Sequence, residues 1–124
     1  MNAVELARTA YAPSNTAIRT AQSTEYEALA RVTRQLKAKS GQSGGYIALV
    51  QALHENRRLW SLLAVNVADP ENALPDDLRA RLVYLAEFTN HATSKVLARE
   101  MPVDALIDIN LAVMAGLRAQ GTTQ

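Results

Sequence analysis

The sequence predicts an all-α protein, a single small bundle of about four to five helices that occupies residues 1–124. Alanine and leucine are abundant, whereas aromatic residues make up only 5% of the chain, and this mixture favours helix over strand. Apolar residues recur at spacings of three and four within long stretches that hold neither proline nor glycine. A length of 124 residues and a hydrophobic share of 48% fit one domain with one core.

The first predicted helix covers residues 2–11, in which Val4, Ala7 and Tyr11 form one apolar stripe. So short a helix is not stable alone in water. We therefore expect this segment to dock on the rest of the protein or on a partner. Pro13 interrupts the pattern that follows.

The second predicted helix covers residues 16–40, and the polar residues 14–22 at its start are compatible with a loop or with a weak helical extension. Its apolar seam runs from Tyr26 to Leu36 at helical spacing. Three of the five glycines lie in residues 40–45, so this segment is predicted to be the flexible linker. Four basic residues around the other side form a candidate basic face: Arg31, Arg34, Lys37 and Lys39.

The third predicted helix covers residues 46–68 and holds the only tryptophan, Trp60. Its first half has a narrow apolar stripe, whereas its second half, from Leu59 to Val67, is apolar on nearly every side. A helix that is apolar all round is normally covered all round. We therefore expect the core to be deepest here.

A polar turn at residues 69–72 separates this helix from a fourth one, predicted for residues 75–99. Pro75 suits the first position of a helix, and the two aspartates that follow suit its first turn. The fifth predicted helix covers residues 103–118 and follows Pro102. Flexible ends are expected at residues 1–3 and 119–124.

Composition excludes several classes of protein. The chain has no cysteine, which rules out a disulfide framework, a thiolate metal site and a cysteine nucleophile. Residues 1–11 contain Glu5 and Arg8 and lack the apolar stretch of a signal peptide. No apolar run is long enough to cross a membrane, and a net charge of +1 does not demand a nucleic-acid partner. We therefore expect a cytoplasmic protein that does not contact the membrane.

No catalytic or metal-binding set stands out. His54 is followed by Glu55, but position 58 is Arg58, where a zinc-protease motif needs a second histidine. His91 lies on another helix, and no third ligand accompanies the two histidines. Glu55 and Glu87 are better interpreted as solvated helix carboxylates than as an acid–base pair. We therefore expect a protein that is not an enzyme and that uses no metal, cofactor or small-molecule substrate.

Two candidate binding surfaces remain. The basic face is either the solvated side of a helix or a contact with RNA or an acidic partner, and no RNA-binding aromatic signature accompanies it. Trp60 is either a core residue or the floor of a groove that receives a partner helix. The candidate partner groove combines it with apolar residues of the next two helices: Trp60, Tyr84, Phe88, Ile109, Leu111 and Met114.

Two motifs resemble those of a known family. The segment from Leu59 to Pro75 is similar to the signature of the flagellar biosynthesis regulator FlaF family, a leucine–tryptophan stretch followed by Asp-Pro-x-Asn-x-Leu-Pro. The segment from Leu106 to Leu117 has the family's Ile-Asn and Met-x-Gly-Leu pattern, and the Ala10-Tyr11 pair fits as well. The resemblance extends over residues 10–117. Residues 12–22 depart from it, because they lack the proline-and-charge helix start expected of the family.

The resemblance implies a small, helical, cytoplasmic protein of flagellated bacteria that works in flagellin synthesis and secretion alongside the post-transcriptional regulator FlbT. Such a protein could bind unassembled flagellin as a secretion chaperone. It could instead act on translation of flagellin mRNA, directly or with FlbT, or serve as a homodimeric scaffold for FlbT. Apolar residues beyond the main stripes favour a protein partner, and a charge of +1 is low for a direct RNA binder. We therefore favour flagellin binding.

Overall fold

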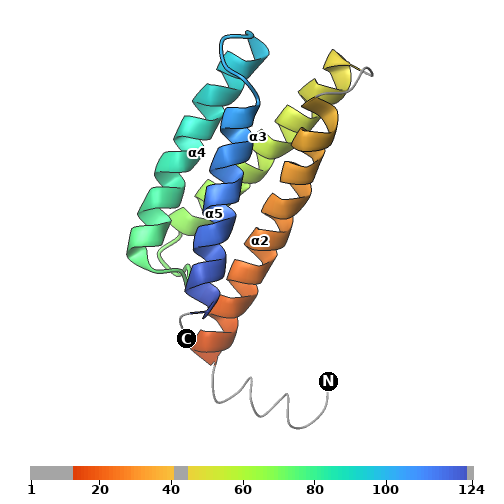
Figure 1. Ribbon diagram of the computed structural model, residues 1–124. Coiled ribbons are helices and arrows are strands. Elements are labelled where there is room, and N and C mark those ends of the chain that lie inside the picture. Colours follow the sequence, from red (N-terminus) through yellow and green to blue (C-terminus); the bar gives the residue numbers. More distant parts are fainter. Residues whose placement is uncertain (1–12, 41–44, 123–124) are drawn as a thin grey trace.

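Four helices form an up-down-up-down bundle in the computed structural model, which describes residues 13–40 and 45–122 (Figure 1). Those residues contain no strand, and the all-α prediction is confirmed. The predicted helix 2–11 lies outside the described residues. The four helices are α2 (Pro13–Ser40), α3 (Tyr46–Ala68), α4 (Asp76–Leu97) and α5 (Asp104–Thr122).

The predicted range of α3 agrees with the structure, whereas other helix boundaries shift. α2 begins at Pro13 instead of residue 16, because proline is tolerated in a first turn and no helix breaker follows it. α4 ends before the predicted residue 99, since Arg99 takes a left-handed φ of 62° that stops the helix. α5 continues to Thr122, so residues 119–122, predicted as part of a flexible end, are helical.

The bundle places α3 between α2 and α4, and α5 closes it against α2 and α4. The backbones of α4 and α5 approach each other less closely than those of the other neighbouring pairs. Figure 1 shows the start of α2 and the end of α5 at the same end of the bundle. There the Arg118 guanidinium donates a hydrogen bond to the Tyr26 hydroxyl and lies over its ring, 5.2 Å from the centroid.

The core consists of two apolar clusters that follow one another along the bundle. We call them the Trp60 cluster, which lies toward the α3–α4 turn, and the Leu53 cluster, which lies toward the other end. The buried members of the Trp60 cluster are Leu29, Trp60, Leu63, Val67, Leu74, Leu82, Ala86, Val113 and Leu117. Those of the Leu53 cluster are Leu36, Ala52, Leu53, Ala92, Val96, Leu106 and Ile107.

A layer of buried polar side chains separates the two clusters. Each helix contributes one member, at a position that lies between its residues in the Trp60 cluster and its residues in the Leu53 cluster. None of the four side chains is more than 2% exposed. We call this set the central polar layer: Thr33, Asn56, Thr89 and Asn110.

The second half of α3 is less covered than its apolar sequence predicts. Leu62 and Val65 are 54% and 70% exposed and lie on the outer side of the helix. The expectation that this segment is covered on all sides is therefore wrong among the described residues. The reason is geometric: α3 contacts only α2 and α4 closely, so the side of α3 away from these two helices faces outward.

Candidate functional site

Trp60 is a core residue and is not available as the floor of a partner groove. Its side chain is 1% exposed and belongs to the Trp60 cluster. The indole Nε1–H donates a hydrogen bond to Asn110 Oδ1 at 2.9 Å, and Asn110 Nδ2 donates to Asn56 Oδ1 at 2.8 Å. These two hydrogen bonds fix the axial register of α5 relative to α3, because a shift by one helical turn would leave buried polar groups without hydrogen-bond partners.

The other five residues of the predicted groove do not line a single surface. Tyr84 and Phe88 lie one turn apart on the outer side of α4 and are 66% and 41% exposed. On α5, Leu111 is exposed, whereas Ile109 and Met114 are half-buried and pack against the Trp60 cluster. Met114 also accepts a long contact from the Thr33 hydroxyl, at 4.0 Å from its sulfur.

Three of the four residues of the predicted basic face line one depression. Arg31, Arg34 and Lys39 line a broad depression next to α3, whereas Lys37 is exposed and does not line it. Arg31 and Lys37 are six residues apart on the helix, which directs their side chains about 120° apart. The depression therefore includes Arg31, Arg34 and Lys39 of the predicted basic face and leaves out Lys37.

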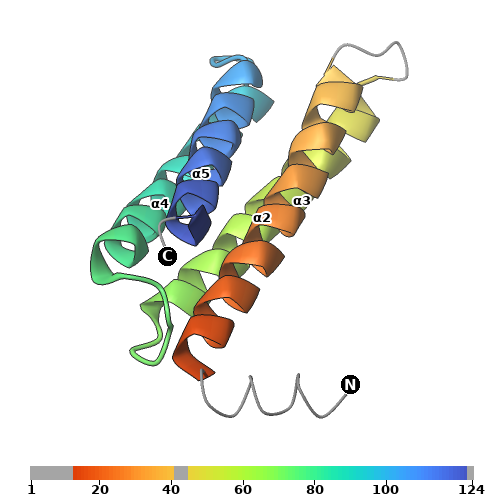
Figure 2. The same cartoon turned by 60° about the horizontal axis from the view of Figure 1, so that its bottom comes forward.

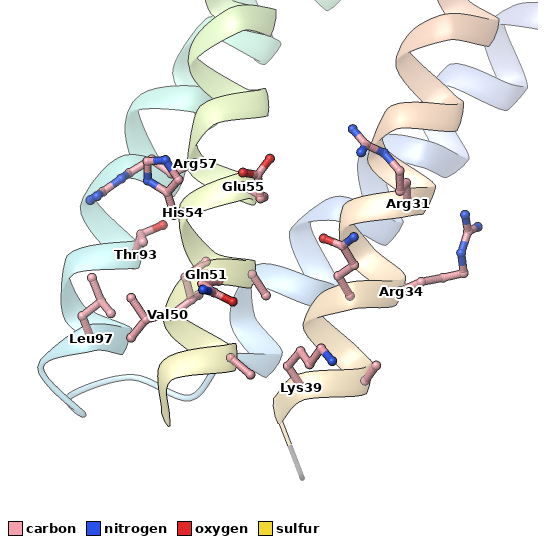
Figure 3. Close-up of a pocket in the computed structure, with 15 residues that line it drawn as sticks. Arg31, Arg34, Lys39, Val50, Gln51, His54, Glu55, Arg57, Thr93 and Leu97 are labelled. Atoms are coloured by element: carbon pink, nitrogen blue, oxygen red, sulfur yellow. The ribbon is translucent and has the colours of Figure 1, made fainter. Parts of the chain in front are cut away.

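The depression has a volume of about 970 Å³ and runs across the outer side of α3, from α2 on one side to α4 on the other (Figure 3). Its α2 side carries Arg31, Arg34 and Lys39, and its α4 side carries Thr93 and Leu97. It is open to solvent. Six apolar residues form much of its lining: Ala38, Ala48, Val50, Ala52, Leu53 and Leu97.

The rim of this depression is positively charged. Arg31, Arg34, Lys39 and Arg57 all line it, and Glu55 is its single carboxylate. Within the described part of the chain the one ion pair joins Arg79 and Asp76, so none of these four cations has an ion-pair partner there. Lone cations around apolar side chains provide a surface for an amphipathic segment that carries acidic groups.

The histidines and carboxylates do not gather into a reaction site. His54 and Glu55 are neighbours on α3, and His91 lies exposed on the outer side of α4. No group of three or more histidine, aspartate and glutamate side chains that could hold a metal occurs among residues 24–40 and 45–119. The lining of the depression therefore offers apolar and charged contacts for binding.

The turn after α3 is held by side chains that cap the helix. Asn72 Nδ2 donates to the Asn66 carbonyl at 3.0 Å, and Asp69 Oδ1 accepts the backbone N–H of Glu71 at 2.9 Å. Arg79, which the sequence pattern places on the wet side of α4, is half-buried and donates to two backbone carbonyls. Arg79 Nε donates to the carbonyl of Val67 in the last turn of α3 at 2.7 Å, and Arg79 Nη2 donates to the carbonyl of the C-cap residue Asp69 at 2.8 Å.

A smaller depression of about 480 Å³ lies beside this turn, and it contains a carboxyl group that the sequence pattern did not single out. Burial raises the pKa of Glu25 from 4.5 to about 7. Its Oε2 atom is buried and has no hydrogen-bond partner in the described structure. Asp69 and Glu71 line the same depression. No spacing in the sequence connects Glu25 with the turn, because the contact depends on how α2 packs beside the end of α3.

No helix in the described ranges 13–40 and 45–122 has the length and apolar character needed to cross a membrane. A family model described as "Flagellar protein FlaF" matches residues 7–117. No curated protein and no solved structure matches the chain. The family match includes nearly all of the bundle, with its capped turn and central polar layer, and the chain therefore belongs to the FlaF family of flagellar proteins.

Proposed function

We propose that this flagellar protein is a non-catalytic, cytoplasmic protein that binds unassembled flagellin in the manner of a secretion chaperone. The single observation that carries the proposal is the depression over α3, with its apolar lining and its rim of cations without ion-pair partners. Such a surface is complementary to an amphipathic helix that carries acidic residues beside its apolar face.

The chemistry of the depression favours a polypeptide over a nucleic acid. Its lining contains six apolar side chains and no phenylalanine, tyrosine or tryptophan, so His54 is the one lining residue with a ring on which a base could stack. Tyr46 is the tyrosine nearest in sequence to the α3 residues of the lining. The Arg99 guanidinium already lies over its ring, 5.5 Å from the ring centroid. A net charge of +1 also gives little long-range attraction for a polyanion.

The cationic rim nevertheless supports one second candidate, an action on flagellin mRNA either directly or with FlbT. Arg31, Arg34 and Lys39 lie on one side of α3 and Arg57 belongs to α3 itself, so four cations line one depression, and cations of this kind bind phosphate groups. A scaffold for FlbT is the third alternative, and it would use the same bundle without any affinity for flagellin.

The test is binding of the purified full chain to monomeric flagellin, measured by size-exclusion chromatography and calorimetry at about 10–50 μM, where micromolar affinities are resolved. Arg31→Glu reverses a charge on the rim, and we expect it to weaken binding at least about tenfold, or about 1.4 kcal/mol. Lys37→Glu is the matched control, because it makes the same change on the same helix outside the depression.

The outcomes distinguish the candidates. Failure of the unmodified chain to bind flagellin, together with a gel shift of flagellin mRNA that Arg31→Glu abolishes, would replace the proposal with the RNA candidate. Capture of FlbT without flagellin would favour the scaffold. Equal loss of flagellin binding in Arg31→Glu and Lys37→Glu would leave flagellin as the partner but remove the depression as its site.

A further inference from the structure

The outer side of α4 carries a stripe of exposed residues that the proposed function does not use. The aromatic rings of Tyr84 and Phe88 lie at its centre, and charged or imidazole side chains lie at its ends. The spacing between successive members alternates between four and three residues. The stripe consists of Asp77, Arg81, Tyr84, Phe88, His91 and Lys95, all of them exposed.

This spacing is the repeat by which one helix packs along another in a coiled coil. The buried stripe of α4 already packs against the rest of the bundle through Leu82, Ala86, Thr89 and Val96. The exposed stripe is therefore a second seam on the same helix. Figure 1 and Figure 2 both show α4 at the edge of the bundle, with no described helix over its outer side.

We propose that α4 pairs through this stripe with α4 of a second copy of the chain, antiparallel, about a twofold axis level with Ala86. The stripe is complementary to itself in this orientation, as an isologous interface requires. Lys95 meets Asp77 of the second copy, and Phe88 meets Tyr84. Arg81 meets His91. Each of these three residue pairs occurs twice in the dimer, because the axis relates the two copies.

The charges select the antiparallel orientation. Asp77 and Lys95 stand at opposite ends of the stripe, and neither forms an ion pair within the described residues. Antiparallel pairing brings opposite charges together at both ends, whereas parallel pairing would bring aspartate to aspartate and lysine to lysine. The helix dipole also favours an acid at the start of α4 and a base near its end, but it gives no reason for two exposed aromatic rings between them.

The size of the seam sets the strength of the dimer. From residue 77 to residue 95 the stripe is about 27 Å long at 1.5 Å per residue. One pair of helices of this length buries less surface than a permanent dimer needs. Glu87 is exposed beside the stripe, and the twofold axis brings it near Glu87 of the second copy, so the two carboxylates repel each other. We therefore expect a dissociation constant on the order of 10–100 μM.

The test is sedimentation equilibrium of the full chain from about 10 to 500 μM, a range that spans the expected dissociation constant. We expect the mass to rise with concentration from the 13.5 kDa of one chain toward twice that value. Asp77→Lys and Lys95→Asp should each weaken association at least about tenfold. An equimolar mixture of the two variants should associate again, because each end of the seam then joins a lysine to an aspartate.

A second pair of variants tests the aromatic centre. Phe88→Ala should weaken association at least about tenfold, because it removes two ring contacts from each dimer. Val65→Ala is the matched control, since Val65 is an exposed apolar residue on the outer side of α3. It should leave the dissociation constant unchanged within about twofold.

Three results would overturn the proposal. The first is a single-chain mass at every concentration. The second is a dimer that Phe88→Ala and both charge variants leave intact, or a mixture of the charge variants that stays monomeric. The third is a monomeric chain in which Phe88→Ala reduces flagellin capture and Val65→Ala does not, because the stripe would then belong to flagellin.

Discussion

The two apolar clusters of the core differ in how they are held. The Trp60 cluster contains the largest buried side chain, and directional bonds surround it: the indole bond to Asn110, the Arg79 bonds to the end of α3, and the contact of Arg118 with Tyr26. Among the described residues, the Leu53 half has one hydrogen bond between helices, from the Tyr46 hydroxyl to the Leu97 carbonyl at 3.4 Å.

The depression with the cationic rim opens over the less tightly bonded half, beside Leu53. One half of the bundle, around Trp60, therefore carries most of the bonds that define the fold, and the other half, around Leu53, carries the binding surface. Substitutions near Trp60 should therefore reduce stability with little direct effect on binding, whereas substitutions on the rim of the depression should do the reverse.

The largest effect is expected at Trp60. Trp60→Ala should lower the free energy of unfolding by about 3–5 kcal/mol, because it leaves a cavity and removes the donor to Asn110. Leu53→Ala, at the equivalent depth of the other cluster, should cost less, about 2–3 kcal/mol. Urea unfolding followed by circular dichroism measures both. A larger loss at Leu53 would contradict the ranking of the two halves.

The central polar layer is expected to give the next largest effect. Asn110→Leu should cost about 2–3 kcal/mol, because both the Trp60 N–H and the Asn56 side chain lose their partner inside the core. Thr89→Val is the control in the same layer, since the Thr89 hydroxyl is buried and has no hydrogen-bond partner in the described structure. It should be neutral or stabilising. Equal losses in the two variants would show that packing, and not bonding, sets the cost.

The capped turn is expected to give a smaller effect. Arg79→Met keeps the apolar part of the side chain but removes its bonds to the Val67 and Asp69 carbonyls, and should cost about 1–2 kcal/mol. Arg58→Met, on α3 and exposed, is the control and should change stability by less than about 0.5 kcal/mol. Thermal unfolding of both variants in one buffer tests the difference.

The smallest effect depends on pH. Burial raises the pKa of Glu25 from 4.5 to about 7, so the folded chain binds a proton more tightly than the unfolded chain. Stability should therefore fall as the pH rises from 4.5 to 7. Glu25→Gln cannot ionise, so near pH 8 it should be more stable than the parent by about 1 kcal/mol, a value reduced because the group is partly exposed. Near pH 4 the two proteins should be equally stable, and a constant difference across this range would contradict the assignment.

Sequence patterns predicted the helices well because they depend on local spacing. The range of α3 and the inner positions of α4 and α5 follow from apolar residues at three- and four-residue intervals. Spacing along one helix does not show which side a neighbour will cover. For that reason Leu62 and Val65 were expected to be more covered than they are.

The candidate surface was harder to predict, because it joins residues from three helices. Arg57 lies on α3 and was not grouped with the cations of α2, whereas Lys37 was grouped with them and does not line the depression. The bond between Trp60 and Asn110 spans fifty positions. An asparagine at an inner position of an amphipathic helix indicates that a buried hydrogen bond is present, but the sequence does not identify the residue that forms it.

The burial of Trp60 also gives the protein a built-in optical reporter. It is the only tryptophan, it is 1% exposed, and its N–H is bonded to Asn110. Its fluorescence should therefore be blue-shifted in the folded chain and should respond to the packing of α3 against α5, with no contribution from other indoles. A ligand that binds only at the surface should leave the emission maximum in place, so a shift on mixing would reveal that the bundle itself rearranges.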